Sequence, residues 1–171
     1  MKPYLKEGVL LEFGARNVTT PNEIFSIRSF LHQLLPEDQI SLPVAQVPVL
    51  SAERTFWEKA TLIHIECTKT INKYPPYSIP FELPSVLRLS RHWYDLAMLF
   101  RNDVGKQAAN NRKLLNEVVQ HKKVFFTRKD YNYDACLNGS LRLIPNEEDL
   151  IKLEQDYEAM IENGMFWLYP K

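Results

Sequence analysis

The sequence predicts an α+β protein in which helices dominate and a small sheet lies near the N-terminal end. Apolar residues recur every three or four positions through most of the chain after residue 51, which is the spacing of amphipathic helices. Two short apolar runs before that point have the length of strands. The chain has 171 residues, 45% hydrophobic and 25% charged, so it fits one folded domain and excludes a disordered or disulfide-scaffold protein.

Both predicted strands lie in residues 1–50. The run Val9–Phe13 is apolar except for Glu12, and this pattern is typical of a buried strand. Val44–Leu50 predicts the second strand, and Pro48 places it at an edge or bulge because proline cannot donate to the ladder. A carboxylate inside a buried strand needs a partner or a function, which makes Glu12 a candidate site residue.

Five helices are predicted. Ser51 and Asn146 are natural N-caps for the second and the last of them, and a proline-rich stretch over 74–84 predicts an extended connector. The helices extend from Pro21 to about Leu34, from Ala52 to about Lys69, from about Val86 to Phe100, from Gln107 to Lys122, and from Glu147 to Asn163. Residues 1–50 would form a small sheet with one helix, residues 51–171 a helical half, and the two halves one compact unit.

Composition removes several function classes. The 21 basic and 21 acidic side chains cancel, so the chain lacks the strong positive field of a generic nucleic-acid binder. No run is long enough for a membrane span or a signal peptide, which favours a cytoplasmic protein without a membrane partner. Cys67 and Cys136 are expected to be reduced and buried, and His64 with Cys67 lacks the second ligand pair of a zinc site. The sequence has no glycine-rich phosphate loop and no nucleophile elbow.

Three charged residues stand out: Glu12 in the first strand, Lys59 in the helix after Ser51, and Asp95 in the helix before Phe100. A purely local interpretation pairs Glu12 with a nearby base, leaves Lys59 on an exposed helix edge and joins Asp95 to Arg91 as an i,i+4 ion pair. The functional interpretation brings the three together around a phosphate-bearing ligand and its metal.

Four segments resemble a known family. They are Ser51–Lys59, Arg88–Leu96, Val118–Phe126 and Tyr133–Leu137. Together they resemble the AbiEii/AbiGii family of nucleotidyltransferase toxins, which belong to bacterial type IV toxin–antitoxin and abortive-infection systems. The resemblance extends from about Val9 to the C-terminus. It implies a polymerase-β-like nucleotidyltransferase fold, represented here by a helix-rich C-terminal part and a small incomplete sheet, in which residues 1–50 are the remnant of the catalytic sheet.

The same resemblance implies roles for individual residues. Glu12 matches the third carboxylate beside the family's Mg²⁺ pair, Lys59 the lysine that contacts the nucleoside triphosphate, and Asp95 the aspartate of a later motif. Arg88, Arg91 and His92 would complete the nucleotide-binding surface. Such chemistry needs a divalent cation and a side-chain cation directed at the leaving phosphates.

One part of the family pattern is missing. The family's first motif, Gly-Ser followed by Asp-x-Asp, supplies two metal carboxylates, whereas the single Gly-Ser pair here, Gly139-Ser140, comes late in the chain. We therefore expect little or no transfer by this chain alone, and an incomplete sheet whose edge is either exposed or paired with another copy. The alternatives are a non-catalytic module that binds a nucleotide or a cognate antitoxin, and one half of a split enzyme. The acceptor is RNA in some relatives, and basic and aromatic residues over 122–133 would suit it.

Overall fold

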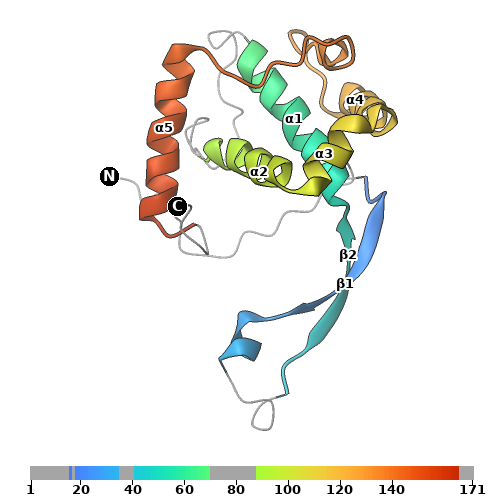
Figure 1. The fold of residues 1–171 in the computed structure, drawn as a ribbon, viewed down its shortest axis with the longest axis vertical. Helices are drawn as coiled ribbons and strands as arrows, with labels where there is room; N and C mark the ends of the chain where they lie inside the picture. Colours follow the sequence, from blue (N-terminus) through green and yellow to red (C-terminus); the bar gives the residue numbers. More distant parts are fainter. Residues whose placement is uncertain (1–15, 17, 35–40, 70–87, 166–171) are drawn as a thin grey trace.

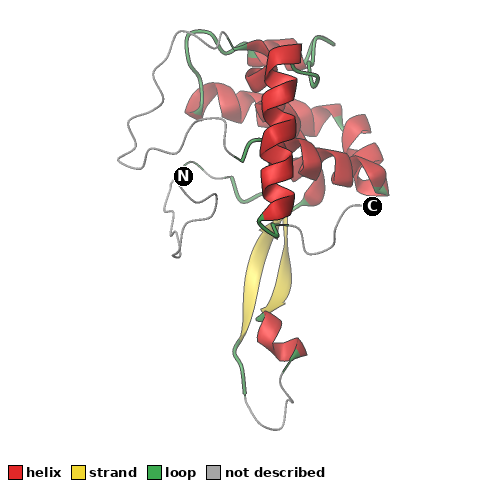
Figure 2. Cartoon of the chain, turned by 90° about the vertical axis from the view of Figure 1, so that its left-hand side faces the viewer, coloured by secondary structure: helices red, strands yellow, loops and turns green. Residues whose placement is uncertain are grey.

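The computed structural model describes residues 16, 18–34, 41–69 and 88–165 (Figure 1). A body of helices forms one part of the molecule, and a long two-stranded hairpin projects away from it (Figures 1 and 2). The α+β, helix-rich class predicted from the sequence is confirmed. The predicted strand Val9–Phe13 with Glu12, the connector over 74–84 and the last six residues lie outside the described residues.

The hairpin consists of β1 (Asn22–Arg28) and β2 (Val44–Leu50), paired antiparallel with Asn22 opposite Leu50. The prediction of β2 is confirmed. The predicted helix from Pro21 to Leu34 is wrong, because its first half is β1 and only Phe30–Gln33 forms a short 3₁₀ helix. The helical spacing was misleading here, since the β-branched and aromatic side chains of β1 also suit a strand and β2 supplies the partner.

The apolar side chains of the hairpin remain exposed. Phe25 and Ile27 of β1 lie opposite Val47 and Ala45 of β2, and 48% of Phe25 and 47% of Ile27 are accessible. In the described part of the chain the sheet has only these two strands. Among the described residues, no third strand pairs with either outer edge of the hairpin. Association of two copies through such an edge stays a prediction.

Helix α1 (Ala52–Thr68) is the central element of the body and confirms the prediction for this segment. The hydroxyl of Ser51 accepts a hydrogen bond from the N–H of Arg54 at 3.2 Å, as an N-cap should. Trp57 is buried, and its indole Nε1 donates to the carbonyl of Ala108 at 2.9 Å. Helices α2, α3 and α4 pack around α1, as Figure 1 shows.

The next helices in the described part of the chain are α2 (Ser90–Arg101), α3 (Asp103–Asn110) and α4 (Arg112–Phe125). The prediction of a single helix from Gln107 to Lys122 is wrong, because the helix is interrupted at Asn111, between the end of α3 and the start of α4. There the side chain of Asn111 accepts a hydrogen bond from the N–H of Leu114 at 3.0 Å and caps α4. Asparagine favours caps over helix interiors because its amide competes with the backbone, which explains the break.

The last helix, α5 (Glu147–Glu162), begins where the sequence predicted, with Asn146 accepting a hydrogen bond from the N–H of Asp149 at 2.9 Å. Asp156 of α5 lies buried against the start of α2. Its carboxylate accepts hydrogen bonds from the Ser90 N–H at 2.9 Å and the Ser90 hydroxyl at 2.6 Å. A side chain of α5 thus caps α2 and fixes where that helix begins.

His64 fastens the loop between α4 and α5 to α1. It is 1% exposed; its Nδ1 accepts a hydrogen bond from the Arg142 N–H at 3.0 Å, and its Nε2 lies 3.2 Å from the Asn132 carbonyl. The ring therefore carries its proton on Nε2, which donates to that carbonyl. Burial lowers the pKa of His64, opposed by the hydrogen bond to Asn132.

Within the described ranges, no helix has the length and apolar character needed to cross a membrane.

Candidate nucleotide site

The ammonium of Lys59 joins α1 to α2. Its Nζ lies 2.7 Å from Oδ2 of Asp95 and 3.0 Å from Nδ1 of His92. The local interpretation paired Asp95 with Arg91, but Asp95 forms its ion pair with Lys59 of the neighbouring helix. Two of the residues that the family resemblance singled out, 36 positions apart, therefore meet in the fold. We call Lys59, His92 and Asp95 the lysine cluster.

His92 is uncharged at neutral pH. Burial is the main cause that lowers its pKa to about 4, and the positive charges of Lys59 and Arg91 add to this effect. Asp95 opposes the shift, and Lys122 reinforces it. Because an ammonium has no acceptor, the Nδ1 of a neutral His92 must accept the hydrogen bond from Lys59, which places the ring proton on Nε2.

The other two predicted nucleotide contacts lie around the start of α2. Arg91 is exposed in the first turn, and its charge reaches His92. Arg88 precedes the helix in a left-handed conformation, with φ of 75°, and its backbone N–H donates to Asp156 at 2.6 Å. At the start of α2, the backbone of Arg88 therefore contacts α5, whereas the side chain of His92 contacts α1.

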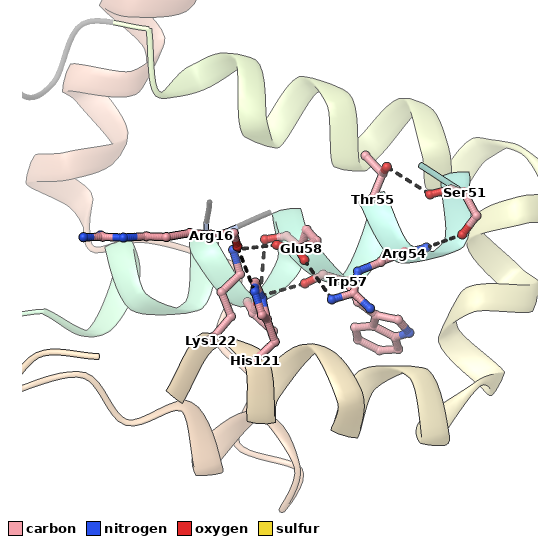
Figure 3. Close-up of polar contacts among 9 residues, drawn as sticks. Arg16, Ser51, Arg54, Thr55, Trp57, Glu58, His121 and Lys122 are labelled. Atoms are coloured by element: carbon pink, nitrogen blue, oxygen red, sulfur yellow. Dashed lines mark hydrogen bonds and ion pairs between the residues drawn. The ribbon is translucent and has the colours of Figure 1, made fainter. Parts of the chain in front are cut away.

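A second charged group, which the sequence did not single out, lies beside the first. Glu58 of α1 accepts from Lys122 of α4 at 2.6 Å and lies 3.4 Å from Nη2 of Arg54 (Figure 3). The i,i+4 spacing of Arg54 and Glu58 in the sequence is typical of an ion pair on one helix. The ion pair between Glu58 and Lys122 forms only because α4 packs on α1. Of these three residues, Lys122 also acts on His92 as a positive charge.

Residues 2–166 match the family model described as nucleotidyl transferase AbiEii toxin, type IV toxin–antitoxin system. The chain belongs to the AbiEii family. The match spans nearly the whole chain, as the resemblance of its segments predicted. No curated protein and no solved structure gave a significant match.

The described part of this AbiEii chain does not provide a magnesium site. Among the described residues, no group of three or more histidine, cysteine or carboxylate side chains could hold a metal ion. Asp95 is engaged with Lys59, and Glu12 lies outside the described residues. His64 is hydrogen-bonded to backbone groups through both ring nitrogens, so neither nitrogen is available to bind a metal together with Cys67.

A separate groove of about 570 Å³ lies between α2 and α5. Its walls are mainly apolar and aromatic, with Arg101 and Glu154 as its charged members. The lysine cluster does not line it. A triphosphate needs several cationic or N–H donors, so this groove does not suit one, and the lysine cluster remains the best candidate within the described residues.

The lysine cluster has one clear chemical capacity. A lysine ammonium has three N–H donors, and Asp95 and His92 accept two of them. In the described part of the chain the third donor has no acceptor, and the Lys59 side chain is 23% exposed. The cluster can therefore present one oriented, charged N–H to an anionic group that approaches from solvent.

Proposed function

We propose that this chain is the triphosphate-binding part of an AbiEii nucleotidyltransferase and that Lys59 contacts the phosphates of a nucleoside triphosphate. The observation that carries the proposal is the lysine cluster, in which two of three ammonium donors are occupied and the third is available among the described residues. Family membership supports the same assignment, since Lys59 lies in one of the segments that resemble the family.

The charge around the cluster suits a polyanion. Lys59, Arg91 and Lys122 all act on His92 as positive charges, whereas among the described residues Asp95 is the carboxylate that acts on it. A phosphate oxygen that accepts from Lys59 would form a charge-assisted hydrogen bond, which is about twice as strong as a neutral one. Arg88 and Arg91 are further candidates for the phosphates, because both lie at the start of α2.

Transfer of the nucleotidyl group requires more than this site. A nucleotidyltransferase uses Mg²⁺ held by carboxylates, and the described residues do not fit such a centre. The sequence also lacks the Asp-x-Asp that supplies two of the family's metal ligands. We therefore propose that the 171-residue chain binds a nucleotide but transfers it slowly or not at all. Radiolabelled transfer by the purified chain, abolished in Glu12→Ala, would contradict this proposal.

Calorimetry with ATP and GTP, with and without magnesium, tests the binding. We expect Lys59→Met to weaken binding by about tenfold to a hundredfold, because it removes a charged hydrogen bond worth roughly 1.5–3 kcal/mol. Lys106→Met is the matched control, since Lys106 is exposed on α3 and pairs only with Asp103 in the described structure. Absence of nucleotide binding by the wild-type chain, or equal binding by Lys59→Met, would overturn the proposal.

The remaining partners follow from the family. A cognate antitoxin is expected because the family consists of toxins of type IV toxin–antitoxin systems. An RNA acceptor is a further proposal, supported by the basic and aromatic residues over 122–133. If the chain binds no nucleotide but binds an antitoxin, the non-catalytic module is the better description. If it gains transfer activity when a second polypeptide supplies the missing carboxylates, it is half of a split enzyme.

A further inference from the structure

Lys59 can be directed at a phosphate only if something holds it. A lysine side chain has several rotatable bonds, and fixing it costs up to about 2 kcal/mol of rotamer entropy. In this fold two acceptors on α2 hold it, Oδ2 of Asp95 at 2.7 Å and Nδ1 of His92 at 3.0 Å. Because ammonium donors are tetrahedral, two fixed hydrogen bonds also fix the direction of the third N–H.

We propose that His92 is a positioning residue that acts through Lys59, accepting one ammonium hydrogen bond on Nδ1 while Asp95 accepts another. This inference rests on the proposed function for its consequence, the binding of a triphosphate. It assigns His92 no contact with the nucleotide, whereas the family resemblance alone groups His92 with the nucleotide-binding residues.

A neutral imidazole suits this task better than a second carboxylate. Two carboxylates on Lys59 would give the cluster a net negative charge and repel a triphosphate. One carboxylate and one neutral acceptor leave the cluster without net charge. Burial is the main reason that His92 stays neutral, and three facing cations add to it: Lys59 of α1, Arg91 of α2 and Lys122 of α4. Asp95 is the opposing carboxylate among the described residues. The ring is partly buried, and its Nδ1 lies 3.0 Å from the Lys59 ammonium of α1.

The acceptor atom can be tested apart from the ring. Asparagine places its side-chain oxygen close to the position of Nδ1, so His92→Asn keeps an acceptor for Lys59. Leucine fills a similar volume without any acceptor, so His92→Leu removes the hydrogen bond and keeps the packing. We expect His92→Leu to weaken binding of ATP or GTP by about threefold to tenfold, and His92→Asn to remain within about twofold of the wild type. Equal losses in the two variants would indicate a role in packing alone and overturn the proposal.

A second measurement needs no nucleotide. In the full chain labelled with nitrogen-15, we expect the Nδ1 resonance of His92 at pH 7 to be that of an unprotonated ring nitrogen and Nε2 to carry the proton. In Lys59→Met the pKa of His92 should rise, because a neighbouring cation is lost. A proton on Nδ1 in the wild type, or an unchanged His92 pKa in Lys59→Met, would overturn the inference. Because this arm is independent of nucleotide, it can succeed even if the chain proves not to bind a triphosphate.

Discussion

Glu58 of α1 and Lys122 of α4 form an ion pair of 2.6 Å in which both side chains are largely buried, at 22% and 11% exposure. The same carboxylate lies 3.4 Å from Arg54, whose side chain is only 3% exposed. In the described structure, Nε and Nη2 of Arg54 have no hydrogen-bond partner. Glu58 is therefore the counter-charge of two cations in the interface between α1 and α4.

From this arrangement we expect unequal costs for removing the members of the ion pair. Glu58→Gln leaves two cations without a carboxylate and should lower the free energy of unfolding by about 3 kcal/mol. Lys122→Met leaves Glu58 with Arg54 and keeps an apolar stem, so it should cost about 1 kcal/mol. Urea unfolding of both variants gives the comparison. A larger loss in Lys122→Met than in Glu58→Gln would contradict this interpretation.

The cap that α5 provides for α2 predicts a sensitive site at Asp156. Asp156→Asn turns one acceptor into an N–H₂ group that faces N–H and O–H donors, so we expect a loss of about 2–3 kcal/mol in unfolding free energy. Glu158→Gln, on the exposed side of the same helix, is the control and should change it by less than about 0.5 kcal/mol. Equal stability of the two variants would show that the cap contributes nothing.

The junction of α2 and α3 predicts that Gly105 cannot be replaced. A Cβ at this position would lie 2.4 Å from the Cα of Phe100 and 2.5 Å from the carbonyl oxygen of Leu99, and neither backbone atom can move cheaply. Alanine normally stabilises a helix relative to glycine by about 1 kcal/mol, but here we expect Gly105→Ala to destabilise the protein by about 1–3 kcal/mol. Thermal unfolding measures the effect, with Gln107→Ala on the exposed face of α3 as the control. A gain in stability would mean that the two helices do not pack this closely.

The depressed pKa of His92 predicts a pH dependence of stability. Its pKa is about 4 in the folded chain, mainly because of burial, and 6.5 is the ordinary value expected after unfolding. The unfolded chain therefore takes up more protons between these values, so the contribution of His92 to stability is complete above pH 6.5 and is lost as the pH falls toward 4. The pKa of His64 is also lowered, which adds to the same trend.

We expect the free energy of unfolding of His92→Asn to fall less steeply than that of the wild type between pH 7 and pH 5, because His64 still titrates but His92 is absent. Chemical unfolding at several pH values within this window provides the two curves. Parallel curves would mean that His92 titrates alike in the folded and unfolded chains.

The sequence by itself determined the features that depend on neighbours along the chain. Ser51 and Asn146 were recognisable as caps because an N-cap bonds to an N–H three residues later, and both helices begin there. The segments around Lys59 and Asp95 also identified the family, because those strings of residues are specific.

Only the tertiary structure decided the features that depend on distant partners. The segment after Pro21 has helical spacing, yet its pairing with Val44–Leu50 makes it a strand. Asp95 could have paired with Arg91 in its own helix, but the packing of α2 on α1 gives it Lys59 instead. A local pattern permits several states of similar free energy, and contacts between elements far apart in the sequence select one of them.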